Sequence, residues 1–595
     1  MSLDLTGRIR DLLRDKPWYR LPRFLSAVRL TEMRNELRQM NLHDTEEPPM
    51  TTQAIPADLD PAHRQGRSLD GTFNDLTCPA MGSVGRRLGR NFPLEHVFPD
   101  TANLLVPNPR VVSRELMTRD EFQPATILNL LAAAWIQFMV HDWFVHERSQ
   151  AHFVDIPAAP GDDWGAPAIR VPRTQPDPAP PGSTQPPAYA NLNSHWWDGS
   201  QVYGGGAEMA GLLRAWIGGK LRIEPTGLLP VDPETGLHFS GFTDNWWIGL
   251  AMLHTVFTLE HNHICDRLAA DHPGWTDDQL YTKAKLINSA LLAKIHTVEW
   301  TPAILPHPVI ARGMHVIWSG LAGEELQELL EFLDDKELAG GVIGSSADHF
   351  SAPYSLTEEF VAVYRMHPLM PDRYAFHSLA TGRLLETREL PEIAGQRTPS
   401  IAERFTMPDL FYSFGVAHPG ALTLHNYPRH LQNLTRDNGE RLDLAAVDIL
   451  RDRERGVPRY NEFRRLLRKP PARSFDELTD NPVWRRQLRD VYNGDLEKVD
   501  LMTGLFAEPL PEGFGFSETA FRVFLLMASR RLKSDRFFTD AWTPEVYTEW
   551  GLEWVRKNSM LTVLRRHYPQ LAPSLEGVEN AFNPWKPVTG PTEPS

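Results

Sequence analysis

The stretch ATILNLLAAAWIQFMVHDWF (residues 125–144) is almost wholly apolar, with Asn129 and Gln137 as polar interruptions and His141-Asp142 near its end. Its length approaches that of a membrane span. However, it lies in the middle of the chain, has no second span, and ends in two ionisable residues. These features predict a helix buried in the core of a large globular protein.

Further helical patterns surround this stretch on both sides. They occupy residues 245–270, 277–300, 323–341 and 517–534. Alternating strand patterns are scarce, and no internal repeat occurs. A proline-rich stretch at 156–190 is typical of an extended surface connection and interrupts helices that belong to one core. We therefore expect a mainly α fold, with one large domain over residues 46–595.

Residues 1–45 form a basic helical segment with two possible roles. Residues 1–40 contain nine Lys/Arg and five Asp/Glu, although the whole chain has a net charge of −15. Trp18, Leu21, Phe24, Leu25 and Val28 fall at helical spacing. The segment could lie on an anionic membrane surface, or it could pack on the main body. Charges interrupt it before any apolar run forms, so we expect no signal peptide.

The overall composition narrows the function classes. Lys and Arg number 61 against 76 Asp and Glu, which argues against a nucleic-acid-binding protein. Two cysteines cannot build a disulfide framework or a four-thiolate zinc site. The chemistry of this chain therefore does not depend on thiols.

Two histidines occur in patterns that could serve a haem. Gln137 and His141 are four residues apart and share a helix face. Tyr364 and His367 are three apart, which on a helix places phenol and imidazole side by side. A histidine at 367 could ligate haem iron, and Tyr364 could then be oxidised by that iron. The alternatives are a core histidine bonded to a carbonyl and an ordinary packed pair before a proline.

Oxygen donors alternate in the segment around residue 198. Ser194, Trp196 (through its carbonyl), Asp198 and Ser200 present the oxygen ligands that calcium prefers. Asp142 could add a carboxylate from a distant segment. The alternative interpretation is an Asp-Gly turn in an exposed loop.

Two more segments offer donors for a carboxylate. KIHTVEWT contains His296 and Thr301, and MASRRL contains Arg530 and Arg531. Arginine binds carboxylates through two parallel hydrogen bonds, so these residues could form a carboxylate clamp. A solvated helix end is the alternative for the arginine pair.

Taken in order, these segments resemble the peroxidase–cyclooxygenase superfamily of haem proteins, and more closely the fatty-acid α-dioxygenases. The superfamily pattern consists of Gln137-x-x-x-His141-Asp142, Trp197-Asp198-Gly199-Ser200-x-x-Tyr203-Gly204, Glu260-His261-Asn262 and Tyr364-x-x-His367. The closer resemblance rests on MGSVGRRLGRN (81–91), LLVPNPRVVSREL (104–116), AAAWIQFMVHDW (132–143), KIHTVEWT (294–301), VYRMHPLMPD (363–372), ASRRLKSDRFFT (528–539) and GLEWV (551–555). The similarity covers roughly residues 75–580.

The resemblance implies a role for each of these residues. His141 would be the distal histidine with Gln137 beside it, His367 the proximal iron ligand, and Tyr364 the radical-bearing tyrosine. Asp142, Ser194, Trp196, Asp198 and Ser200 would hold calcium. His296, Thr301, Arg530 and Arg531 would bind the substrate carboxylate, with Arg531 the better candidate of the pair.

Two departures from the superfamily pattern bear on the cofactor. Val140 stands where other members carry an acid, and Thr243 stands where they carry a distal arginine. We therefore expect non-covalent haem b rather than ester-linked haem, and an oxygenase rather than a general peroxidase.

The resulting expectation is a haem-dependent fatty-acid α-dioxygenase that also contains calcium. A peroxide would activate the haem, the Tyr364 radical would remove a hydrogen from the α-carbon of a long-chain fatty acid, and O2 would add to give a 2-hydroperoxy acid. A haem peroxidase of small reductants, or a haem protein that binds lipid or gas without turnover, remain alternatives. We expect a monomer, in the cytoplasm or at a membrane periphery.

Overall fold

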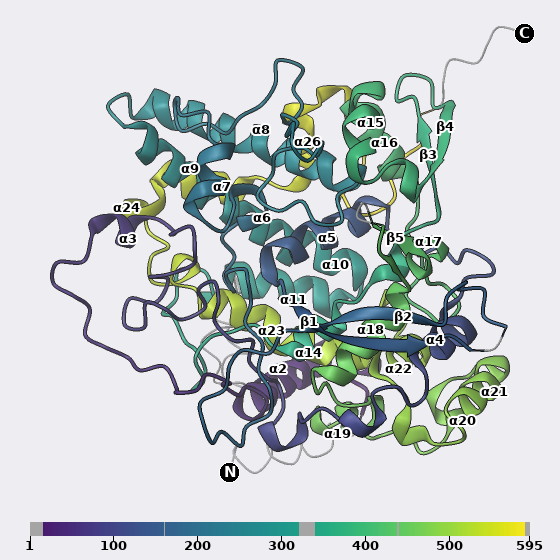
Figure 1. Cartoon of the computed structure of the whole chain (residues 1–595). Helices are drawn as coiled ribbons and strands as arrows, with labels where there is room; N and C mark the ends of the chain where they lie inside the picture. Colours follow the sequence, from purple (N-terminus) through teal and green to yellow (C-terminus); the bar gives the residue numbers. More distant parts are fainter. Residues whose placement is uncertain (1–15, 160, 321–339, 437–438, 589–595) are drawn as a thin grey trace, which may run out of the picture.

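The computed structural model describes residues 16–159, 161–320, 340–436 and 439–588. Helices make up most of the regular secondary structure of the described chain, and its strands form three two-stranded sheets. The predicted mainly α fold with little β is therefore confirmed (Figure 1).

The longer helices are α2 (Arg23–Met40), α5 (Leu131–Trp143), α8 (Ile248–Asp271), α9 (Asp277–Ile295), α11 (Pro308–Ser319), α16 (Met407–Val416), α18 (Leu444–Glu454), α21 (Pro482–Val491) and α23 (Glu518–Lys533). The shorter ones are α3 (Pro61–Gln65), α4 (Pro109–Val112), α6 (Ser200–Tyr203), α7 (Ala207–Leu213), α10 (Thr301–Ile304), α14 (Glu358–Val363), α15 (Thr398–Arg404), α17 (Arg429–Gln432), α19 (Tyr460–Leu466), α20 (Phe475–Leu478), α22 (Leu501–Ala507), α24 (Pro544–Tyr547), α25 (Glu549–Lys557) and α26 (Met560–His567).

Helix α5 lies inside the molecule and packs against α6 and α8 (Figure 1). All of its residues except Gln137 and Val140 are buried, as the apolar sequence predicts. The helix begins at Leu131, later than expected. The reason lies in Asn129, whose side chain donates to the carbonyls of Ala581 and Asn583, so that residues 125–130 lie in turns rather than in the helix.

Helix α9 is shorter than the continuous helix predicted over 277–300. It begins with a capping box between Thr276 and Gln279 and ends at Ile295. The next five residues, His296–Trp300, form a π-helical turn. Single π-turns inside helices are frequent at functional sites. The predicted helix at 323–341 lies almost entirely outside the described residues.

The proline-rich stretch contains more regular structure than a surface connection. Strands β1 (Arg148–Pro157) and β2 (Ala168–Thr174) pair antiparallel and cross the front of the molecule in Figure 1. Trp164, Ile169 and Val171 are buried against α18 in a small second core. The other sheets are pairs of short strands, β3 (Arg373–His377) with β4 (Leu384–Glu389) and β5 (Leu434–Thr435) with β6 (Arg441–Leu442).

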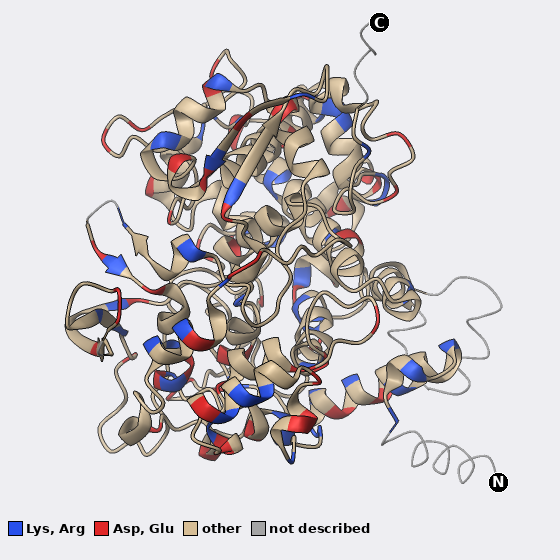
Figure 2. Ribbon diagram, turned by 90° about the vertical axis from the view of Figure 1, so that its right-hand side faces the viewer, with Lys and Arg blue, Asp and Glu red and all other residues tan. Residues whose placement is uncertain are grey.

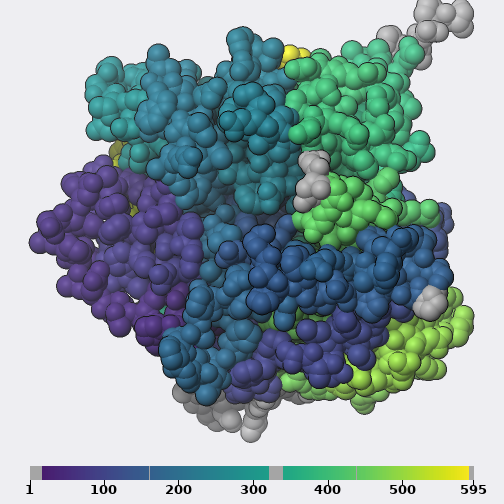
Figure 3. Space-filling view, in the orientation of Figure 1, coloured from purple at the N-terminus to yellow at the C-terminus, as the bar shows by residue number. Residues whose placement is uncertain are grey.

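One connected core extends from Trp18 to Trp585, so distant segments form a single body. Figure 3 shows the N-terminal residues, in purple, against one side of this body. Trp18 is buried between His307, Phe514 and Phe521.

Helix α2 carries both signs of charge (Figure 2) and packs against α11 and α23. For residues 16–45 of this segment the structure shows packing on the main body, and contact with a membrane surface stays a prediction. No helix among the described residues is long and apolar enough to cross a membrane.

Candidate active site

Tyr364 and His367 do not lie on one helix, and that prediction is wrong. Helix α14 ends at Val363, and Tyr364 already leaves helical geometry with ψ of 9°. His367 begins a separate 3-10 turn, His367–Leu369. Pro368 follows directly, and proline lacks the N–H that a continued helix requires. The two side chains are therefore placed by a turn, and each has its own surroundings.

The Tyr364 ring packs against Trp143, at the end of α5. Their ring centroids are 5.0 Å apart in an edge-to-face arrangement. Burial raises the pKa of Tyr364 well above its ordinary value, although the charge of Arg531 acts in the opposite direction. The phenol therefore keeps its hydrogen at neutral pH.

Trp143 also contacts the residues predicted to bind a carboxylate. The His296 ring lies 5.1 Å from it and Trp197 lies 5.3 Å from it. The guanidinium carbon of Arg531 lies 4.3 Å from the Trp143 ring centre and 3.9 Å from that of Trp197. The structure thus brings Tyr364, His296 and Arg531 together around two tryptophans.

These side chains present unused hydrogen-bond donors. Nε and Nη2 of Arg531 and the indole N–H groups of Trp143 and Trp197 are buried without a hydrogen-bond partner in the described part of the chain. Buried donors without acceptors are rare and costly. We call Arg531, Trp143, Trp197 and His296 the Arg531 pocket. Its chemistry suits an anion with several acceptor oxygens.

His296 contributes a further donor. Its Nδ1 accepts the indole N–H of Trp135 at 3.3 Å, and an indole nitrogen can only donate. Burial, reinforced by the charge of Arg531, lowers the pKa of His296 well below its ordinary value. The ring is therefore neutral with its hydrogen on Nε2. Thr301 uses its hydroxyl to close the π-turn, donating to the His296 carbonyl at 2.9 Å.

Arg530 is not part of this pocket. Its guanidinium donates to the carbonyls of Ala352, Pro353 and Ser355 at 2.9–3.3 Å. Successive helical residues point about 100° apart, so the arginine pair faces two different environments. Of the two, only Arg531 lies among the other predicted clamp residues.

Gln137 and His141 share one face of α5, as their spacing predicts. Burial lowers the pKa of His141 to about 3, so its imidazole is neutral. Its Nδ1 has no partner among the described residues, and its ring lies 4.6 Å from that of Phe242. Gln137 accepts the indole N–H of Trp247 at 2.8 Å and donates to the Asn245 carbonyl at 3.3 Å.

His367 is held from one side only. Its Nδ1 lies 2.8 Å from Oδ2 of Asp448 on α18, and its side chain is 34% exposed. Its other nitrogen remains available as a metal ligand. Burial alone would raise the pKa of Asp448, but His367 and Arg365 outweigh it and lower the pKa to about 2. A half-exposed imidazole with one nitrogen anchored and one free fits a proximal haem ligand.

The predicted calcium residues meet around two buried carboxylates. Ser200 donates to Asp142 through its N–H at 2.6 Å, and Ser194 donates to Asp198 at 2.5 Å. Burial and the neighbouring Asp198 raise the pKa of Asp142. Trp196 is fully buried beside them. Two carboxylates that repel each other, with hydroxyl oxygens between them, form a donor set that fits calcium.

Gly199 makes the turn of this segment possible. Its φ is +75°, and a Cβ at this position would approach Oγ of Ser289 to 2.8 Å. Glycine is the residue that adopts this conformation without strain.

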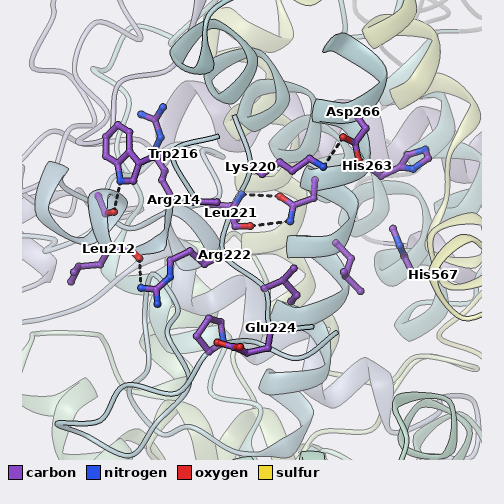
Figure 4. A pocket seen from close by; sticks show the side chains of 16 residues that line it. Leu212, Arg214, Trp216, Lys220, Leu221, Arg222, Glu224, His263, Asp266 and His567 are labelled. Carbon is purple, nitrogen blue, oxygen red and sulfur yellow. Dashed lines mark hydrogen bonds and ion pairs between the residues drawn. The ribbon is translucent and has the colours of Figure 1, made fainter. Parts of the chain in front are cut away.

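A groove of about 840 Å³ lies elsewhere on the molecule (Figure 4). Its walls include Trp216, Arg222, Leu259 and His567, and none of the predicted site residues lines it. Lys220 and Asp266 pair across one side of it at 2.6 Å. The groove is therefore separate from the Arg531 pocket.

Four residues of the site received no role from the sequence. Trp143 and Trp197 lie inside motifs that were recognised, but only the fold shows that they enclose Arg531. Phe360, whose ring centre is 5.5 Å from the Arg531 guanidinium carbon, completes that enclosure. Asp448 is 81 residues from its histidine partner, and its one local signal is a second acid, Asp452, one helical turn later.

Known proteins are similar to this chain along almost its whole length. The profile of the animal haem peroxidase family matches residues 66–580. Alpha-dioxygenase 1 of Capsicum annuum is 36% identical, over 97% of this chain and 91% of its own length. A crystal structure of Oryza sativa fatty acid α-dioxygenase, a tyrosine-to-phenylalanine variant with palmitic acid, has a TM-score of 0.90 and 34% identity, and the match covers 98% of this chain and 97% of that one. Peroxidase A from Dictyostelium discoideum shares the fold alone, with a TM-score of 0.68 and 19% identity, covering 84% of this chain and 96% of its own. The chain belongs to the animal haem peroxidase family and, within it, to the α-dioxygenases.

Proposed function

We propose that this α-dioxygenase binds long-chain fatty acids with their carboxylate in the Arg531 pocket and oxygenates the adjacent carbon through Tyr364. The observation that carries the proposal is a buried arginine with two free N–H groups, packed on the same tryptophan as Tyr364.

The Arg531 pocket supplies binding and orientation. Nε and Nη2 of Arg531 form a fork that matches two carboxylate oxygens. The Nε2–H of His296 adds a neutral donor, and the indole N–H groups of Trp143 and Trp197 can donate from the sides. Because Tyr364 and Arg531 both pack on Trp143, a bound carboxylate places its α-carbon near the phenol. Such positioning selects this carbon over all others in the alkyl chain.

Tyr364 then carries the chemistry. Haem, when bound with His367 as its ligand, supplies the oxidising equivalent that removes an electron and a proton from Tyr364. The phenoxyl oxygen takes one hydrogen atom from the α-carbon and leaves a carbon radical. O2 adds to that carbon, and the peroxyl group takes the hydrogen atom back from the phenol. The product is a 2-hydroperoxy acid, and the tyrosyl radical is regenerated for another turnover.

His141 and Gln137 would serve as the distal residues when haem is bound. His141 is neutral, so it can accept a proton from an activating peroxide. Gln137 is oriented by its two hydrogen bonds to Trp247 and Asn245. Val140 provides no carboxylate for an ester link, which supports non-covalent haem b.

We also propose a calcium ion in the segment after residue 193. Asp142, Asp198, Ser194, Ser200 and the carbonyl of Trp196 would hold it. Asp142 directly follows His141 in α5, so the ion would fix the end of the helix that carries the distal histidine and Trp143. The enzyme is expected to act as a monomer.

The direct test is oxygen uptake by the haem-loaded protein supplied with palmitate and a trace of peroxide. The expected result is consumption of O2 with formation of a 2-hydroperoxy acid and little oxidation of a phenolic dye. Brisk dye oxidation without fatty-acid-dependent uptake would favour a peroxidase of small reductants. Retention of palmitate without either reaction would favour a non-catalytic binding protein.

A further inference from the structure

A hairpin of residues 213–222, which we call the Trp216 hairpin, follows α7 and presents two large apolar side chains to solvent. Trp216 is 60% exposed and Ile217 is 71% exposed. All seventeen tryptophans lie in the described part of the chain, and Trp216 is the only exposed one among them. Leu212 and Met209 on α7 are exposed as well. Single exposed apolar residues are ordinary, but a cluster of them marks an interaction site.

The Trp216 hairpin is held in one fixed position. Arg214 pairs with Leu221 in an antiparallel bridge, which closes the hairpin. The Gly219 N–H donates to Asp277 on α9 at 2.6 Å, and Arg214 donates to the same carboxylate. A Cβ at position 219 would approach the main-chain nitrogen of Tyr281 to 2.5 Å, so glycine is required there. The apolar tip is therefore presented by a rigid frame.

Trp216 itself adopts a conformation that a bulky residue rarely takes. Its φ of +58° lies in the left-handed region, where a Cβ is strained. Its indole N–H donates to the Gly211 carbonyl at 3.1 Å, and the guanidinium carbon of Arg214 lies 4.0 Å from its ring centre. These contacts fix the ring, yet most of it faces solvent, so burial does not compensate for the strain. Strain of this kind points to a function of the exposed ring.

The groove of about 840 Å³ lies beside the Trp216 hairpin (Figure 4). Trp216 and Leu212 lie at one end of it, and His567 lies at the other. Arg222 and Glu224 are both exposed on its walls. The groove thus offers one cation and one carboxylate next to an apolar tip.

The charges around the tip show which surface it fits. Lys220 is paired with Asp266 at 2.6 Å, and Arg214 is paired with Asp277 and Asp278. The cations near the tip therefore do not exceed the acids. Anionic membranes attract clusters of unpaired Lys and Arg, and the hairpin lacks such a cluster. Alternating charges of both signs instead complement a zwitterionic surface.

We propose that the Trp216 hairpin docks on the surface of a phosphatidylcholine bilayer. Trp216 and Ile217 enter the boundary between headgroups and acyl chains, which is the position that exposed tryptophan favours in membranes. Arg222 contacts the headgroup phosphate and Glu224 the neighbouring ammonium. This surface is distinct from the N-terminal segment, for which the sequence predicts membrane contact.

The experiment measures binding of the haem-loaded full chain to phosphatidylcholine vesicles by flotation. The main variant is Trp216→Gly/Ile217→Ser, in which glycine accepts the left-handed backbone and the fold should be retained. Its partition coefficient should be about 10- to 100-fold lower than that of the wild type. Ile217→Ser alone removes only an exposed side chain and should lower the coefficient by about three- to tenfold. This single variant decides the question if the double variant does not fold.

Leu384→Ser/Leu385→Ser is the matched control. These two neighbours are also exposed but lie on β4, at the opposite side of the molecule from α7 in Figure 1. The control variant should bind vesicles as the wild type does. Replacing half of the phosphatidylcholine by phosphatidylserine should change binding of the wild type by less than about threefold, because the hairpin has no basic excess.

Four outcomes would overturn the inference. They are a wild type that does not float with phosphatidylcholine vesicles, a hairpin variant that binds as tightly as the wild type, an equal loss in the control, and binding that requires phosphatidylserine. A wild-type dimer that the hairpin substitutions convert into a monomer would also overturn it, because this face would then belong to a second copy of the chain.

The inference goes beyond the proposed function, and the two can fail separately. Vesicle binding requires no turnover, so binding without oxygen uptake would count against the proposed function alone. Oxygen uptake with dissolved palmitate, but without vesicle binding, would count against the docking surface alone.

Discussion

Two arginines lie close to Tyr364, Arg365 next to it in sequence and Arg531 on the same tryptophan ring, and their surroundings are opposite. Arg365 is paired with Asp448 and Asp452 at 2.6 and 3.0 Å. Arg531 lies among the rings of Trp143, Trp197 and Phe360, with two of its nitrogens lacking a partner in the described chain. The protein satisfies the first cation itself, and the second is left for a ligand.

The free energies involved support this distinction between a paired and an unpaired arginine. A cation over an aromatic ring gains about 0.5–2 kcal/mol. An uncompensated buried charge costs about 3–5 kcal/mol when its partner is removed. The rings around Arg531 therefore offset only part of the cost of burying it, and a substrate carboxylate would supply the rest.

The largest expected effect comes from removing the Tyr364 hydroxyl. Tyr364→Phe should lower kcat for oxygenation by at least about 10³-fold, because the proposed mechanism routes both hydrogen transfers through that hydroxyl. The Soret band and palmitate affinity should remain. Oxygen uptake and the absorption spectrum measure the two effects.

Tyr568→Phe is a matched control, since Tyr568 is also buried with an unpartnered hydroxyl but lies outside the site. It should retain full activity. An active Tyr364→Phe enzyme would show that the radical is carried elsewhere.

The next effect tests the unsatisfied arginine. Arg531→Gln should lower kcat/KM for palmitate by about 10²- to 10³-fold, in line with the loss of one partner from a buried charge pair. Steady-state oxygen uptake measures this change. In the wild type, kcat/KM should be lower for palmitate methyl ester than for palmitate, and in the variant this difference should disappear.

Arg530→Gln offers the contrast from the adjacent position. Because Arg530 holds three main-chain carbonyls, its loss should lower the melting temperature and leave KM nearly unchanged. If Arg530→Gln raised KM and Arg531→Gln did not, the assignment of the carboxylate site would be reversed.

The next prediction concerns calcium removal. It applies the argument about an uncompensated buried charge to the carboxylates of Asp142 and Asp198. Among the described residues, no cationic side chain is hydrogen-bonded to Asp142 or Asp198, so removal of calcium by a chelator should leave the repulsion between these two carboxylates uncompensated. At a calcium concentration 100 times Kd, removal should cost about 2.7 kcal/mol in the free energy of unfolding. Thermal unfolding with and without chelator measures it.

Asp198→Asn should abolish the dependence on calcium. If neither the chelator nor added calcium changed the melting temperature of the wild type, calcium binding would be excluded.

The smallest effect concerns a satisfied buried histidine. His195 accepts from the Leu356 N–H at 2.9 Å and lies 3.3 Å from the Arg86 carbonyl. Burial lowers its pKa to about 4. In the unfolded chain His195 takes up a proton near pH 6.5, whereas in the folded chain it does so only near pH 4. The free energy of unfolding therefore falls as the pH drops through this window. The slope is at most about 1.4 kcal/mol per pH unit.

Denaturant unfolding between pH 7.5 and 5 measures this slope. His195→Gln should reduce this slope by up to the contribution of one proton. Glutamine can donate to and accept from the same groups as His195, but it does not titrate. An identical slope in the variant would mean that other histidines account for the acid sensitivity.

Much of the fold was predictable from the sequence, and the structure brings several of the candidate site residues together as expected. The apolar run ending in His141-Asp142 specifies a buried helix, and the spacing of Gln137 and His141 places them on one face. The order of the motifs identifies the family. Each of these inferences depends on residues that are close together in the chain.

The remaining features depend on contacts between distant segments. The end of α14 at Val363 follows from the turn before Pro368, and the separation of Arg530 from Arg531 follows from what packs on each face of α23. The enclosure of Arg531 requires α5, α14, α23 and the segment around Trp197 to meet. The contact between His367 and Asp448 joins two helical regions that share no local pattern. Such packing overrides what spacing alone suggests.

The π-turn at His296–Trp300 accommodates one more residue per turn than the helix before it. The Thr301 N–H accordingly bonds to the His296 carbonyl, five residues back, where an α-helix would use the carbonyl four residues back. Deleting one residue between them would restore the α-helical step and leave α10 in its place, because the turn absorbs the extra residue. The deletion would instead redirect the side chains between His296 and Thr301, among them Trp300, whose ring stacks on His296 at 4.8 Å. This single turn therefore determines which ring lies against His296.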